Sequence, residues 1–241
     1  MTVNLYLLTH KCGNNYIQQV HRIARSVPFV KSVQPGQAYN VLKKDAPRSG
    51  TFVRCRNFGH DHVMQATAHD PSRFRFVIFT RHPASFVLSA TKYHLRGGEA
   101  WATTRKQEHL DGMTLYDALH AAKTEADQQI VVMRHFVDHY RRQSSLMRLL
   151  GGDNAIRLKT EDLFTESNES YYHDIAEFVG MNAGSRYSMA LMKASPAFRD
   201  SLPTHSTGAF KDSSPRDRIV GEAGAYYDEH FLPFQEKLEY V

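Results

Sequence analysis

The stretch "LYLLTHKCGNNYIQQVHRIA", residues 5–24, joins a short apolar run to a turn with Lys11 and Gly13 and then to a segment with helical spacing. The apolar residues 3–8 predict a buried strand, because the run is short and ends at a turn. From Tyr16 onward, apolar residues recur at helical spacing, which predicts a helix with one buried face. A strand, a glycine-containing turn and a helix together aim backbone N–H groups and the positive end of the helix dipole at an anion.

The same alternation continues along the chain. Residues 51–55, 73–80 and 155–159 predict further strands, and helical spacing recurs between them, most extensively from Thr114 to about Leu150. Strands that alternate with helices predict a central parallel sheet covered on both faces. We therefore expect an α/β fold in a single domain over residues 1–241.

Composition limits the class of protein. The 241 residues are 41% hydrophobic and 23% charged, which is typical of a globular chain. A net charge of +5 favours an anionic partner, but the chain lacks the blocks of like charge that are typical of nucleic-acid tails. The two cysteines, Cys12 and Cys55, form no C-x-x-C motif, and the N-terminal apolar run is too short for a membrane anchor. We expect a cytoplasmic protein without nucleic-acid or membrane partners.

The turn at residues 11–16 carries the chemistry. Lys11 adds a point charge, Gly13 allows close backbone approach, and Asn14 and Asn15 can donate hydrogen bonds to phosphoryl or sulfuryl oxygens. A Walker A loop has its lysine after the last glycine, whereas here the lysine comes first. A surface lysine in an ordinary strand–helix turn is the alternative interpretation.

This loop resembles the 5′-phosphosulfate loop of sulfotransferases that use 3′-phosphoadenosine 5′-phosphosulfate (PAPS), in which Lys-Ser-Gly-Thr-Thr-Trp is common. Here Cys12 replaces the serine, Asn14 and Asn15 replace the hydroxyls, and Tyr16 replaces the ring that covers the adenine. The resemblance implies the sulfotransferase fold, similar to that of P-loop proteins, with residues Lys11 to Tyr16 binding the donor.

A second match follows the strand at 73–80. In the family, a strand ends in Arg-x-Pro, and a serine eight residues after the arginine lies on the next helix; both bind the 3′-phosphate. Arg81, Pro83 and Ser89 have this order and spacing. The resemblance therefore assigns the 3′-phosphate to Arg81 and Ser89.

Later segments extend the resemblance. The run Glu161-Asp162-Leu163 resembles the end of a family strand, and Thr160 stands where a tyrosine often meets the adenine. Met189 belongs to a stretch that resembles one beside the adenine, and Gly208 and Lys211 match a late loop whose usual Arg-Lys-Gly is missing. We expect all four of these positions, Thr160, Met189, Gly208 and Lys211, to contact the donor.

The implied reaction is an in-line transfer of a sulfuryl group from PAPS to a hydroxyl or amine of a small-molecule acceptor. It needs no metal and releases adenosine 3′,5′-bisphosphate (PAP). Lys11 would stabilise the charge on the bridging oxygen. Segments 31–50 and 96–113 have no recognisable motif and are expected to form acceptor or lid loops.

The general base is the least constrained residue. His60 is the preferred candidate and His62 the second, since many cytosolic family members use a histidine at the end of the strand that precedes the Arg-x-Pro strand, about two dozen residues upstream. A loop histidine without a role, the carboxylate of Glu99 and solvent stay open as alternatives. Arg54 and Arg56 could instead hold an anionic acceptor.

Two other classes of protein are compatible with the strand–loop–helix. A P-loop kinase would need Mg²⁺ and usually a Walker A motif, and a basic module that binds polyanions would not explain the spacing of Arg81 and Ser89. Donor binding separates the three, because only the sulfotransferase should prefer a nucleotide with a 3′-phosphate to ATP.

Overall fold

The computed structural model describes residues 2–25, 27–44, 50–198 and 214–240. Within these residues, five strands form one parallel sheet in the order β2-β3-β1-β4-β5. The strands are β1 (Val3–Leu8), β2 (Phe29–Val33), β3 (Phe52–Arg56), β4 (Phe74–Thr80) and β5 (Ala155–Lys159). The strand order reverses between β1 and β4. In open parallel sheets, ligands bind beyond the carboxyl ends of the strands at such a point.

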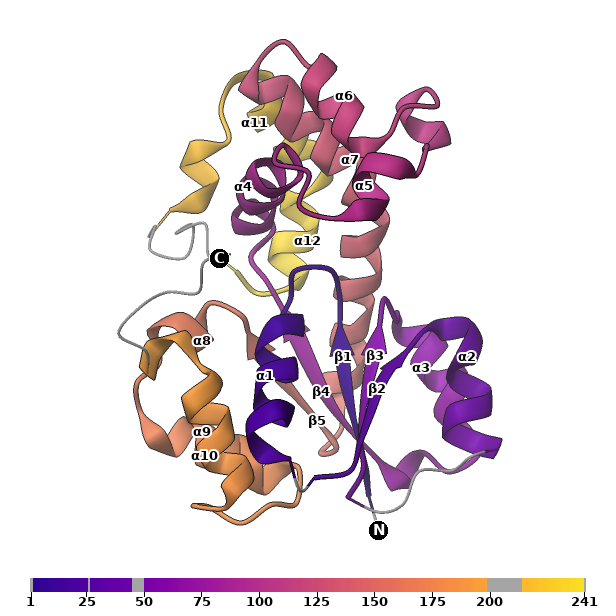
Figure 1. The fold of residues 1–241 in the computed structure, drawn as a ribbon, viewed down its shortest axis with the longest axis vertical. Coiled ribbons are helices and arrows are strands. Elements are labelled where there is room, and N and C mark those ends of the chain that lie inside the picture. Colours follow the sequence, from indigo (N-terminus) through magenta and orange to yellow (C-terminus); the bar gives the residue numbers. More distant parts are fainter. Residues whose placement is uncertain (1, 26, 45–49, 199–213, 241) are drawn as a thin grey trace. The chain divides into compact units, whose positions relative to one another are not determined.

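Helices cover both faces of the sheet (Figure 1). Tyr6 and Leu8 face one layer of helices, whereas Leu5 and Leu7 face the other, because successive side chains of a strand point to opposite faces. The first layer is α1 (Asn14–Ala24), α9 (Glu169–Phe178) and α10 (Arg186–Ala194), and the second includes α3 (His60–Thr67) and η4 (Leu146–Gly151). Shorter elements nearby in the chain are α2 (Pro35–Tyr39), η1 (Asn40–Lys44), η2 (Pro71–Arg73), α8 (Asp162–Thr165) and η5 (Pro196–Phe198).

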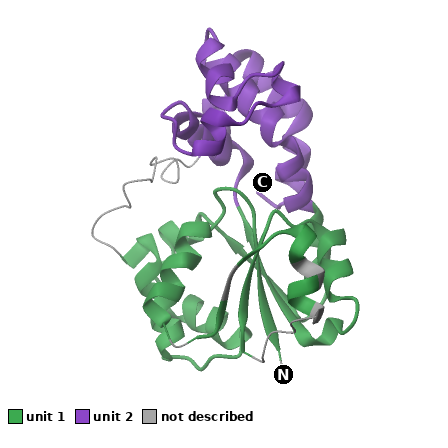
Figure 2. Cartoon of the chain, turned by 45° about the vertical axis from the view of Figure 1, so that its right-hand side comes forward, with its two compact units in different colours: residues 1–80, 145–204 green, residues 81–144, 205–241 purple. Residues whose placement is uncertain are grey.

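The chain divides into two compact units, which are described separately (Figure 2). Unit 1, residues 1–80 and 145–204, contains the sheet. Unit 2, residues 81–144 and 205–241, is helical, and its core joins Phe86 to Phe136 and Tyr140 with ring centroids 5.0 and 5.3 Å apart. Its elements are α4 (Pro83–His94), α5 (Ala100–Thr104), η3 (Glu108–Leu110), α6 (Leu115–Ala121), α7 (Glu125–Ser145, whose last residue is in unit 1), η7 (Pro215–Arg218), α11 (Gly221–His230) and α12 (Leu232–Lys237).

Two local predictions need correction. The helical region from Thr114 is broken into α6 and α7, because Thr114 and Thr124 each cap a new helix through the N–H of Asp117 and Asp127. The segment 31–50, expected to form an acceptor or lid loop, also contains part of the edge strand β2, which pairs with β3 alone. The apolar pattern did not predict this strand because Lys31 and Ser32 interrupt it.

Candidate functional site

The loop after β1 is a tight turn that leads directly into α1. The Cys12 N–H donates to the Thr9 carbonyl at 3.2 Å, and both Lys11 and Gly13 have positive φ angles, 55° and 73°. Left-handed backbone is costly for a lysine and easy for glycine. The turn therefore holds Lys11 in an unusual conformation one residue before a buried thiol, that of Cys12.

Gly13 is required by space as well as by backbone angle. A Cβ atom at this position would lie 2.4 Å from Cδ1 of Phe79, a residue near the end of β4. The turn after β1 therefore lies against the end of β4, on the side where the strand order reverses. No residue with a side chain fits there without displacing the Phe79 ring.

The first turn of α1 presents unpaired donors. Its first intrahelical bond runs from the Ile17 N–H to the Gly13 carbonyl at 2.9 Å. Within the described part of the chain, the N–H groups of the four residues before Ile17, namely Gly13, Asn14, Asn15 and Tyr16, have no acceptor. The first turn also contains no acidic residue. Orphan N–H groups and the dipole of an eleven-residue helix make this end of α1 suited to an anion.

The side chains of the loop differ in what they can still bind. The Asn14 amide donates to the Thr9 carbonyl at 2.8 Å, so one of its two donors is used, whereas the Asn15 side chain is exposed. The Tyr16 ring lies in the core, and its hydroxyl donates to the Leu191 carbonyl at 3.0 Å. Burial raises the pKa of this hydroxyl well above its ordinary value. The ring of Tyr16 is therefore part of the core, and the group that Tyr16 leaves without an acceptor in the described chain is its backbone N–H.

The second motif lies in unit 2. Arg81 follows the last residue of β4 and is buried, and its Nη2 donates to the Ser85 carbonyl at 3.2 Å. Ser89 is one helical turn beyond Ser85 and is also buried. Arg81 therefore precedes α4, which begins at Pro83, and Ser89 lies within this helix.

The two candidate bases have different environments. His60 begins α3; its N–H donates to Ser145 Oγ at 3.0 Å, and its Nδ1 lies 3.0 Å from Asp61 Oδ1. When Nδ1 donates to this carboxylate, Nε2 carries the lone pair that a base needs. His62 instead accepts the Gly59 N–H through Nδ1 at 3.1 Å and acts as a helix cap.

Asp61 and Ser145 were not identified from the sequence. Asp61 also pairs with Arg148 Nη2 at 3.2 Å, and its hydrogen bond with His60 is the main cause that lowers its pKa. The only local signal for this arrangement was the adjacent His-Asp pair; Ser145 is 85 residues away.

Of the four remaining predicted donor contacts, the structure describes Thr160 and Met189. The N–H and the hydroxyl of Thr160 both donate to the Thr80 carbonyl at 2.8 Å, which ties the ends of β5 and β4 together. Met189 is exposed on α10, with 43% of its surface accessible. Gly208 and Lys211 lie outside the described residues.

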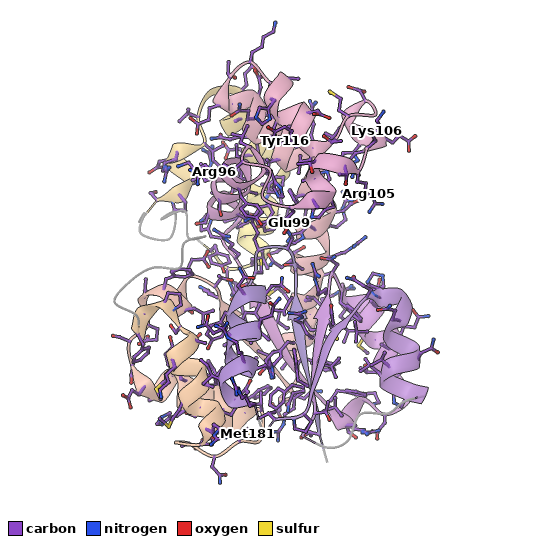
Figure 3. All side chains as sticks on the ribbon, viewed as in Figure 1. Arg96, Glu99, Arg105, Lys106, Tyr116 and Met181 are labelled. Atoms are coloured by element: carbon purple, nitrogen blue, oxygen red, sulfur yellow. The ribbon has the colours of Figure 1, made fainter. Side chains whose placement is uncertain are left out.

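The expected lid segment 96–113 contains short helices rather than one loop. Figure 3 labels Glu99, Arg105 and Lys106 on this segment of unit 2. The Glu99 carboxylate accepts the indole N–H of Trp101, whose ring stacks on His135 with centroids 5.5 Å apart. Glu99, the alternative base, is therefore already engaged by a neighbour.

The described residues contain no group of three or more His, Cys, Asp or Glu side chains that could hold a metal ion. Among these same residues, no helix combines the length and the apolar character needed to cross a membrane.

The chain is similar to a solved structure of mouse sulfotransferase SULT7A1 complexed with PAP. The two share 11% sequence identity with a TM-score of 0.53, over 99% of this chain and 89% of that chain. No family model matches the chain. No curated protein matches it either. The α/β fold with a parallel sheet is confirmed, and it is the sulfotransferase fold.

Proposed function

We propose that the protein is a sulfotransferase that transfers a sulfuryl group from PAPS to a hydroxyl or amine of a small-molecule acceptor and releases PAP. The observation that carries the proposal is the start of α1, where four N–H groups have no acceptor within the described chain and Lys11 adds a positive charge. The sulfotransferase fold supports it.

Bound PAPS supplies an activated sulfuryl group, whose transfer, like that of a phosphoryl group, depends on positioning and charge stabilisation. The N–H groups from Gly13 to Tyr16 donate to the oxygens of the 5′-phosphate. The ammonium of Lys11 stabilises the negative charge that develops on the bridging oxygen. His60, with Nδ1 directed to Asp61, accepts the acceptor's proton at Nε2.

Recognition of the 3′-phosphate is assigned to Arg81 and Ser89. A guanidinium binds a phosphate through two parallel hydrogen bonds, and the serine hydroxyl adds a third donor. Both residues are buried in unit 2, where water competes little with such bonds.

Calorimetric titration with PAP, AMP and ATP tests this proposal. Wild-type protein should bind PAP more tightly than ATP; the reverse order would indicate a kinase, and binding of neither would indicate a polyanion-binding module. Arg81→Ala should weaken PAP binding by about 1.5–3 kcal/mol, because a charge-assisted hydrogen-bonding partner is lost.

Two controls define the assignment. AMP, which lacks the 3′-phosphate, should bind Arg81→Ala and wild type equally, and an equal loss for AMP and PAP would refute the role of Arg81. Ser89→Ala should weaken PAP binding less than Arg81→Ala, while Ser85→Ala, one turn earlier on α4, should leave it unchanged.

A further inference from the structure

One face of β3 carries two arginines toward α1. Phe52, Arg54 and Arg56 alternate along this strand, and the register sets Arg54 beside Tyr6 and Arg56 beside Leu8. Tyr6 and Leu8 belong to the core under α1, so the two arginines share that face of the sheet.

Arg54 is buried without a partner for two of its nitrogens. Only 8% of the residue is exposed, and neither Nε nor Nη1 has a hydrogen-bond acceptor in the described chain. Two neighbouring residues also have buried polar atoms without a hydrogen-bond partner in the described chain. They are His21, at both ring nitrogens, and Tyr6, at its hydroxyl. The rings of His21 and Tyr6 lie with centroids 6.0 Å apart.

Among the described residues, no carboxylate compensates the charge of Arg54. Burial lowers its pKa, and the nearby charge of Arg56 lowers it further; no carboxylate is among the causes. Burial and then the charge of Arg54 lower the pKa of His21 to about 4, so this ring is neutral at pH 7. Arginine stays protonated even so. A buried cation with unpaired N–H groups is costly until an anion binds it.

We propose that Arg54 forms a subsite for an oxyanion — a carboxylate, phosphate or sulfate group — carried by the acceptor. This inference rests on the proposed sulfotransferase function. Strand β3 lies on the side of β1 opposite to β4, away from the point where the strand order reverses. It ends at Arg56, at the carboxyl edge of the sheet where α3 and His60 begin, with Arg54 on the α1 face and α3 covering the other face. On this proposal, the acceptor carries an acidic group.

The test uses inorganic sulfate as probe, titrated into protein that has been saturated with PAP, so that the phosphate contacts of the nucleotide are already occupied. Binding is followed by calorimetry and by the thermal unfolding midpoint. The variants are Arg54→Gln and, as a matched control, Arg75→Gln. Arg75 is also a strand arginine, and its Nη1 has no hydrogen-bond partner in the described chain. It lies at the amino end of β4, and its guanidinium is over the ring of Phe178.

Sulfate should bind wild type and Arg75→Gln equally and should bind Arg54→Gln at least tenfold more weakly. Without sulfate, Arg54→Gln should unfold at the same or a higher temperature than wild type, because an unpaired buried charge has been removed. Arg54→Lys should bind sulfate more weakly than wild type and more tightly than Arg54→Gln, because an ammonium keeps the positive charge but lacks the planar pair of N–H donors of a guanidinium.

Three results would overturn the subsite. Sulfate could fail to bind the PAP-saturated wild type, or bind Arg54→Gln as well as wild type. Arg54→Gln could also lose affinity for PAP as strongly as for sulfate, which would assign Arg54 to the nucleotide. If wild type binds no PAP, the proposed function fails by itself, and the same sulfate titration without PAP still tests the anion site.

Discussion

Helices α1 and α3 begin at the carboxyl ends of neighbouring parallel strands, yet their first turns are arranged in opposite ways. At α1, the backbone donors have no acceptor in the described chain and no acidic residue is present. At α3, the Gly59 N–H is bound by His62 and the His60 N–H by Ser145, and Asp61 stands in the first turn.

The two helix starts are suited to different chemistry. A helix start whose donors are unpaired can bind an anionic ligand with its partial positive charge, whereas one whose donors are bound by protein side chains cannot offer those donors to a ligand. We therefore assign the anion of the donor to α1 and the proton acceptor to α3. The predictions below test this division.

The largest effect is expected at α3. His60→Ala should lower turnover by about 10²–10⁴-fold, the range typical of a lost general base. Affinity for PAP should stay unchanged, because the variant spares the donors of α1. Turnover is measured as transfer of radiolabel from ³⁵S-PAPS to the best acceptor in a panel of phenols, alcohols and amines.

His62→Ala is the matched control, two residues away on the same helix. Loss of its bond to the Gly59 N–H should reduce the free energy of unfolding by about 0.5–2 kcal/mol, as for other N-terminal caps, with near-normal turnover. If His62→Ala loses turnover and His60→Ala does not, the roles are exchanged. If both retain it, the proton goes to another group.

The next effect is expected at the loop before α1. Lys11→Ala should lower kcat by about 10²–10³-fold, as when one donor to a developing negative charge is removed, with much less change in PAP affinity. Lys11→Arg should not restore kcat, because a planar fork cannot replace a compact ammonium. Both variants keep a Cβ at the positive φ of this residue, so the backbone cost is the same. Normal kcat with only a raised KM for PAPS would make Lys11 a binding residue.

The smallest effect concerns the glycines before the two helices. Gly13→Ala should lower the free energy of unfolding by about 1–3 kcal/mol, because its φ is 73° and its Cβ would clash with Phe79. PAP affinity should fall as well. Gly59→Ala is the control, since its φ of −108° suits any residue. Urea unfolding measures both; equal stability of the two variants would show that the loop adapts and that its shape is not essential.

Much of the framework could be predicted from contiguous residues. The apolar runs of β1, β3, β4 and β5, the helical spacing after Tyr16 and the Lys11–Gly13 turn all follow from side-chain periodicity and from backbone angles, which neighbouring residues encode. The T-x-x-D caps that separate α6 from α7 were equally local, and only the continuous helical spacing obscured them.

The state of each functional group was decided by tertiary structure. Tyr16 turns into the core because Leu191, 175 residues away, accepts its hydroxyl, and Thr160 joins β5 to Thr80 instead of exposing its side chain. Nε and Nη1 of Arg54 are buried because strand register and helix packing place them in the sheet face under α1, and the described chain brings no acceptor to them. The sequence by itself determined which donors and charges the protein possesses. Which of them stay without a hydrogen-bond partner depends on residues distant in the chain. Burial removes water, so a buried donor or charge without a protein partner costs free energy.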